Sequence, residues 1–176
     1  MSAADGKARL IEGSWVAHRL AMKESPAWRA LPDNGRRVLD LLETEHMRHA
    51  GTANGQLAYT YDQFQKSGIR RASVALAIRQ CVALGFLEVT RVGYKSAAEF
   101  KVPSLYRLTY VFGRAKGAMG KAGRQDPTEE WQQILDDDGA AKALAAARSS
   151  ARVVRRVAAA QLETDAPPSP MGAVAA

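Results

Sequence analysis

The sequence has very little of the chemistry that metal sites and secreted proteins use. It holds one cysteine, Cys81, which excludes an internal disulfide and indicates a reducing compartment. Of its three histidines, His46 and His49 lie three residues apart on a predicted helix, whereas His18 is remote in sequence. A metal site needs further ligands, so we expect helix-surface or interface histidines and no bound metal.

Long apolar runs and catalytic motifs are also missing. No apolar stretch approaches the roughly 20 residues that span a bilayer, and residues 1–13 lack the apolar segment of a signal peptide. The glycines between Gly113 and Gly123 do not have the spacing of a phosphate-binding loop, and no serine lies in a nucleophile elbow. We therefore expect a soluble, cytoplasmic protein that is not an enzyme and uses no cofactor.

Positive charge is what the sequence has in excess. Its 176 residues include 25 lysines and arginines against 18 acidic residues, which gives a net charge of +7. A basic balance of this size favours a polyanionic partner, either a nucleic acid or an acidic membrane surface. The length leaves room for one domain with a modest core plus extensions.

Two short helices joined by a tight turn are predicted between residues 60 and 85. Thr60 can cap the first helix, and Gln63 stands where a capping box needs Glu or Gln. Gly68 can adopt positive φ, which ends that helix and turns the chain. The second helix is expected to begin near Arg70 and to stop at Gly85.

The second helix has an apolar stripe and a polar side. Val74, Ile78 and Cys81 recur at helical spacing, so this stripe faces a core and Cys81 is expected to be a buried thiol. Off the stripe lie the residues that suit a helix entering the major groove: Arg70, Arg71, Ser73 and Arg79. Arginine in a first turn opposes the helix dipole unless an anion compensates. The alternative is ordinary solvated surface.

A β-ribbon is predicted after this helix. Residues 86–92 and 105–112 alternate apolar and polar side chains and should pair as a hairpin, and residues 56–59 form an earlier short strand. The loop between the hairpin strands is the predicted wing, and its side chains suit the phosphate backbone or the minor groove: Arg91, Tyr94, Lys95 and Lys101. Thr60 and Tyr61, where the first helix begins, complete the predicted DNA-facing set. The alternative is an ordinary exposed hairpin.

The flanking segments are predicted from composition. Ser25 can cap a short helix that stops before Pro32, and Asp33 or Asn34 can cap a longer one over residues 35–49. The domain boundaries that follow are a disordered N-terminus, a folded domain, a glycine-rich basic linker, a helical extension and a disordered tail: residues 1–13, 14–112, 113–125, 126–162 and 163–176. The extension has a helical stripe of small apolar residues: Leu144, Ala147, Ala151, Val154 and Ala158. This stripe either pairs with a second copy or stays solvated.

These patterns give an α+β fold, mainly α, with a winged helix-turn-helix, a β-wing of two to three strands and a C-terminal helical extension. Residues 70–89 resemble the recognition helix and first wing strand of winged-helix regulators of the MarR and GntR type. The residues that carry this resemblance are Ser73-Val74, Ala77-Ile78 and Gly85-Phe86-Leu87. The resemblance implies that Arg70, Arg71, Ser73 and Arg79 face the major groove and that Lys95 lies in the wing.

A longer resemblance covers about residues 14–112. The chain is similar there to small winged-helix proteins of bacterial plasmids and phages, including the N-terminal domains of replication initiators. The motifs occur in the same order: Ser25–Leu31, Asn54–Leu57, Gly85–Leu87 and Tyr106–Thr109.

The sequence thus predicts a non-catalytic protein that binds double-stranded DNA at specific sequences, foremost a transcriptional regulator. One alternative is a replication or transfer accessory protein of a mobile element. Another is a winged-helix protein–protein interaction module that uses Leu76 and the wing. Palindromic DNA sites would require a homodimer, for which the C-terminal helix is one option.

Overall fold

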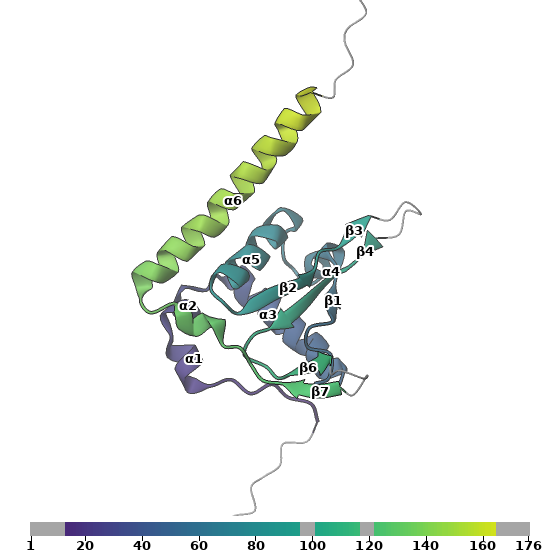
Figure 1. The fold of residues 1–176 in the computed structure, drawn as a ribbon, viewed down its shortest axis with the longest axis vertical. Coiled ribbons are helices and arrows are strands. Elements are labelled where there is room, and N and C mark those ends of the chain that lie inside the picture. The colour runs from purple at the N-terminus through teal and green to yellow at the C-terminus, as the bar shows by residue number, and fades with distance from the viewer. Residues whose placement is uncertain (1–12, 96–100, 117–121, 165–176) are drawn as a thin grey trace, which may run out of the picture.

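The computed structural model describes residues 13–95, 101–116 and 122–164, with side chains over 13–94, 102–113 and 125–150. It shows an α+β fold that is mainly helical and contains a small three-stranded antiparallel sheet (Figure 1). The predicted N-terminal disorder at 1–12 and the tail at 165–176 lie outside the described residues.

In chain order the elements are α1 (Leu20–Glu24), α2 (Pro26–Ala30), α3 (Asp33–Arg48), β1 (Leu57–Tyr59), α4 (Tyr61–Lys66), α5 (Arg71–Ala83), β2 (Leu87–Arg91), β3 (Tyr94–Lys95), β4 (Lys101–Val102), β5 (Ser104–Leu108), β6 (Gly113–Lys116), β7 (Ala122–Gln125), the 3₁₀ helix η2 (Glu130–Gln133) and α6 (Asp137–Thr164).

The helix pair α4–α5 forms where the capping residues and the two glycines predict it. The Thr60 hydroxyl accepts a bond from the Gln63 backbone N–H at 3.2 Å, and the Gln63 side chain accepts one from the Thr60 N–H at 2.8 Å. This confirms the capping box. Gly68 and Gly85 have φ values of +91° and +78°, which only glycine adopts readily, so each ends its helix as predicted.

The sheet has the strand order β1-β5-β2, so β5 lies in the middle. Leu57 pairs with Tyr106 on one side of β5, and Leu87 pairs with Leu108 on the other. The predicted short strand and the predicted hairpin are therefore confirmed. Beyond the sheet, β3 and β4 continue the hairpin as a second antiparallel pair.

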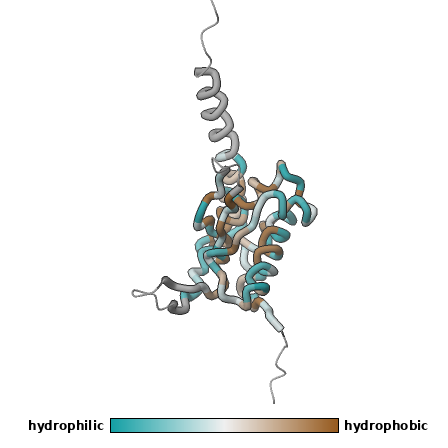
Figure 2. Tube along the Cα trace, turned by 90° about the vertical axis from the view of Figure 1, so that its right-hand side faces the viewer, coloured by the Kyte–Doolittle hydropathy of each residue, from teal (hydrophilic) through white to brown (hydrophobic). Residues whose placement is uncertain are grey.

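The core lies between the helices and the sheet. Val38 and Leu42 of α3 are buried, as are Val74, Ile78 and Cys81 of α5, which confirms the predicted stripe. The Cys81 thiol donates to a backbone carbonyl oxygen of α3 at 3.4 Å, and its burial raises the pKa of the thiol. The hydropathy colouring alternates between brown and teal along the elements, as expected where each has one buried face (Figure 2).

Helix starts differ in one place from the prediction. Ser25 caps α2, since its hydroxyl accepts from the Trp28 N–H at 3.1 Å. Neither Asp33 nor Asn34 caps α3, because the helix begins at Asp33 and its cap position is Pro32, which provides no side-chain bond. Asp33 instead places its negative charge in the first turn, where it favours the helix dipole.

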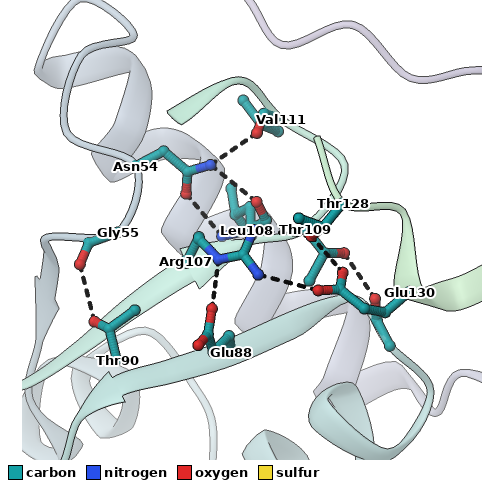
Figure 3. Close-up of polar contacts among 11 residues, drawn as sticks. Asn54, Gly55, Glu88, Thr90, Arg107, Leu108, Thr109, Val111, Thr128 and Glu130 are labelled. Carbon is teal, nitrogen blue, oxygen red and sulfur yellow. Dashed lines mark hydrogen bonds and ion pairs between the residues drawn. The ribbon is translucent and has the colours of Figure 1, made fainter. Parts of the chain in front are cut away.

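Residues 113–125, predicted as a linker, include the antiparallel pair β6–β7. Both flanks of this pair are held by hydrogen bonds to residues beside the central sheet (Figure 3). Before it, the Asn54 amide donates to the Leu108 and Val111 carbonyl oxygens at 2.9 Å each. After it, the Thr128 N–H donates to the Thr109 carbonyl oxygen at 2.8 Å. Anchored flanks bring the two strands together, so their backbone groups can pair.

Helix α6 packs antiparallel across α5 and also contacts α2 (Figure 1). The Asp136 carboxylate accepts from the Gly139 N–H at 2.7 Å, so an acidic cap starts the helix. Ala140, Leu144 and Ala147 are buried, which overturns the solvated alternative for this part of the stripe. The side chains of the other stripe residues, 151, 154 and 158, lie outside the described part. None of the helices described combines the length and apolarity needed to cross a bilayer.

Candidate nucleic-acid interface

A pocket forms where the N-terminal ends of α4 and α5 meet the hairpin at the point where β2–β5 passes into β3–β4. We call it the hairpin pocket, and its volume is about 420 Å³. Four of the ten predicted DNA-facing residues line it: Thr60, Tyr61, Arg71 and Tyr94. Residues that are 34 positions apart in sequence, such as Thr60 and Tyr94, therefore share one surface. The other lining residues are Tyr59, Asp62, Val92, Gly93, Val102, Pro103 and Ser104.

Apolar and aromatic side chains dominate the rim of the pocket. Tyr61 from α4 is 38% exposed, and Tyr94 from β3 is 61% exposed. Val92, between β2 and β3, is 74% exposed. Tyr59 is buried and packs its ring against Phe64 at 4.5 Å, which fixes the wall beneath. Large apolar side chains at the surface mark ligand or partner sites when they gather around a concavity.

The charged side chains of the pocket form one ion pair. The Arg71 guanidinium donates to the Asp62 carboxylate, and both side chains are about half exposed. Arg70 is fully at the surface, just before the first turn of α5, and no ion pair joins it to another described residue. Ser73 is half-buried in the first turn of α5. Its N–H donates to the Arg70 carbonyl oxygen at 2.7 Å.

Arg79 lies apart from the other predicted readers. Its Nε donates to the Ala147 carbonyl oxygen of α6 at 3.0 Å, so the guanidinium is held between two helices. Gln80, the next residue, is buried. Helix α6 therefore contacts α5 at Arg79, whereas Arg70 and Arg71 at the other end of α5 are exposed. The predicted groove-facing position of Arg79 is not the one the structure gives it.

The two sides of the hairpin come close together at Gly93, a residue that the sequence predicts only as the start of a loop. Its N–H donates to the Ser104 hydroxyl at 2.9 Å. A Cβ built on Gly93 would lie 2.5 Å from the Val102 carbonyl oxygen and 2.6 Å from the Ser104 nitrogen. The two sides of the hairpin lie too close together at Gly93 to leave room for a side chain. This contact sets the shape of the pocket wall.

The remaining predicted residues lie along the hairpin. Arg91 is exposed at the end of β2. Lys95 and Lys101 face one another in the backbone register of β3 and β4, but their side chains lie outside the described part. The predicted set is thus divided into four groups. Four residues line the hairpin pocket, Arg70 and Ser73 lie at the start of α5 outside the lining, Arg79 is turned to α6, and these three follow the hairpin.

A separate buried polar cluster joins the N-terminal segment to α3. The Glu43 carboxylate accepts from the Tyr110 hydroxyl and lies 2.8 Å from His18 Nε2. Burial, and then the Glu43 charge, raise the pKa of Tyr110 well above its usual value. His46 is also buried, and no described atom bonds its Nδ1. Sequence reasoning missed this cluster, because it depends on contacts between distant segments.

The chemistry of these groups does not point to a metal centre. Across the residues that the structure describes, no three His, Cys, Asp or Glu side chains gather as metal ligands would. The site that remains is an open pocket of aromatic and apolar groups with one ion pair. The chain matched no protein-family model, no curated protein and no solved structure when it was compared with them.

Proposed function

We propose that this protein binds double-stranded DNA at specific sequences through a winged helix-turn-helix and catalyses no reaction. The observation that carries the proposal is the meeting of the α5 N-terminal end with the β2–β5 hairpin at one pocket. In a helix-turn-helix, the second helix enters the major groove with its N-terminal residues against the base edges. The order α4, turn, α5, hairpin matches that arrangement.

The first turn of α5 supplies the reading groups. Arg70 is exposed and unpaired among the described residues, so it can donate to a guanine edge or a phosphate. Arg71 is held by Asp62 in the free protein, but an exposed ion pair contributes only about 0–1 kcal/mol. A guanidinium has five N–H donors, so Arg71 can donate to DNA while it stays paired with Asp62. A phosphate or base acceptor here also compensates the helix dipole, which arginine otherwise opposes.

The hairpin and the overall charge supply affinity. The exposed Tyr94 shares the pocket with Arg71, and Arg91 is exposed at the end of β2; both suit the sugar–phosphate backbone. The net charge of +7 adds attraction that does not depend on sequence. This attraction weakens as the salt concentration rises, because releasing condensed counterions into a more concentrated solution gains less free energy. Specificity then comes from the first turn of α5, because Arg79 in the other half of that helix is turned to α6.

The test is selection of bound sequences from random duplex DNA with the wild-type protein and two variants. Arg71→Ala should lower affinity by about 1–3 kcal/mol and relax the preference at one or two positions of the selected motif. Arg48→Ala, which removes an exposed arginine of α3 outside the pocket, should leave the motif unchanged. Failure of the wild-type protein to retain any duplex at physiological salt would refute the proposal.

Footprinting then assigns the biological role. Protection over a promoter identifies a transcriptional regulator, and protection over iterated repeats at an origin identifies a replication accessory protein. A selected motif with two inverted half-sites one helical turn apart indicates a homodimer on DNA. Retention of a protein partner that survives charge reversal at Arg70 and Arg71, without DNA binding, identifies an interaction module instead.

A further inference from the structure

The described side chains that line the hairpin pocket carry no net charge. Arg71 and Asp62 are its charged lining residues, and they form an ion pair with each other. A phosphate needs cations that are not already neutralised, as in the binding of DNA backbones by lysine and arginine. The exposed arginine nearby, Arg70, is not part of the lining. The pocket therefore suits an uncharged group better than a phosphate.

Two tyrosine rings give the pocket faces on which a flat group can stack. Tyr61 comes from α4 and Tyr94 from β3, so the rings approach the concavity from different elements. Both are partly exposed, and neither ring packs against another aromatic ring of the described residues. Stacking of a base on aromatic side chains strengthens binding roughly 5- to 150-fold per base and works with every base, because each has a π face.

The pocket also has the size and the polar groups that a base requires. Its volume of about 420 Å³ lies within the usual range of small-molecule sites. The Arg71–Asp62 pair presents donors and acceptors side by side, which complements the mixed edge of a nucleobase. The Ser104 hydroxyl is held by the Gly93 N–H, so this wall is fixed before any ligand arrives.

We propose that the hairpin pocket binds a single unstacked nucleobase of the DNA. The proposal rests on the proposed DNA binding and adds a preference to it. Removing a base from an intact duplex breaks its stacking and pairing, whereas a mismatched or unpaired base has lost much of this already. The pocket should therefore favour sites where one base at a fixed position is mispaired or single-stranded, such as a locally melted duplex.

The experiment measures affinity for the selected duplex with one mismatch moved along it, position by position. For the wild-type protein, a mismatch at one position should tighten binding about fivefold or more over the matched duplex. Tyr94→Ala should remove this gain, and Tyr94→Phe, which keeps the ring, should retain it. Trp15→Ala, an exposed aromatic residue outside the pocket, should bind like the wild type. A 2-aminopurine at the same position should lose fluorescence when it stacks on Tyr94.

Each outcome decides the matter. Tight binding of the matched duplex with no gain at any mismatch overturns the pocket proposal and leaves DNA binding in place. A gain that persists in the Tyr61→Ala, Tyr94→Ala double variant also overturns it. Absence of binding to any DNA refutes the proposed function, and the pocket proposal falls with it. Thermal unfolding of each variant verifies folding, which exposed side chains on α4 and β3 should not disturb.

Discussion

Asn54 joins the loop before β1 to residues 108–111 through one buried amide. Its Oδ1 accepts from the Leu108 N–H at 2.8 Å, while its Nδ2 donates to the Leu108 and Val111 carbonyl oxygens (Figure 3). Because Asn54 is only 4% exposed, water cannot replace these hydrogen bonds. The sequence Asn54-Gly55 predicts a turn, and it gives no sign of the role of the side chain. Such bonds depend on the partner segment, more than 50 residues away.

His46 should make the stability of the fold depend on pH. Its side chain is 4% exposed, and burial lowers its pKa most, with Glu43 opposing and His49 reinforcing the shift. In the unfolded chain histidine binds a proton below about pH 6.5, whereas folded His46 stays neutral to lower pH. The unfolded state therefore binds more protons in this window, and stability falls as the pH falls. We expect the melting temperature to drop between about pH 7.5 and about pH 5.5.

The comparison of His46→Gln with His49→Gln separates this effect from general acid sensitivity. His49 caps the C-terminal end of the same helix, is exposed and pairs with Glu45 at 3.1 Å. The fall in melting temperature on acidification should be smaller in His46→Gln than in the wild type, and it should persist in His49→Gln. Thermal unfolding followed by circular dichroism at each pH gives the result. An equal drop in wild type and His46→Gln would show that another group is responsible.

At the scale of elements, the hairpin depends on one close crossing. Gly93→Ala would place a Cβ 2.5 Å from the Val102 carbonyl oxygen, so the strands must move apart. Overpacking of this kind costs about 1–3 kcal/mol. Because Gly93 lines the pocket, we expect Gly93→Ala to lower stability in urea and to weaken binding of the selected duplex.

Gly113→Ala is the matched control for that substitution. Its Cβ would meet the side chain of Gln125 at 3.2 Å, which can move away, and it lies in β6 outside the pocket. It should leave DNA binding unchanged. Equal loss of binding in both variants would mean that the crossing at Gly93 does not shape the site.

Elements set by neighbouring residues were predictable, and those set by distant contacts were not. The helix pair α4–α5 follows from a capping box and two glycines, all within 26 residues. The strands β1, β2 and β5 follow from alternation along the chain. The pocket does not, because Gly93, Pro103 and Ser104 reach it only through the hairpin crossing. The pair β6–β7 was missed because glycine and basic residues have low strand propensity.

At the scale of the whole molecule, α6 packs against α5. The high helix propensity of its alanines predicts the helix, whereas small side chains bury little area and give no hint of where it docks. The docking site is known only from the structure, in which Ala140, Leu144 and Ala147 of α6 are buried and Ala147 accepts a bond from Arg79 of α5. The same packing holds Arg79 against α6, two turns along the helix from Arg70 and Arg71.

The position of Arg79 leads to a prediction that distinguishes structural from reading arginines. Its bond to the Ala147 carbonyl oxygen ties α5 to α6, and loss of a hydrogen bond to a charged group costs about 1.5–3 kcal/mol. We therefore expect Arg79→Ala to lower the urea midpoint while the selected DNA motif stays the same. Arg71→Ala should show the reverse, because its pair with Asp62 is exposed and contributes about 0–1 kcal/mol. If Arg79→Ala erased one motif position without loss of stability, α6 would have to leave α5 when DNA binds.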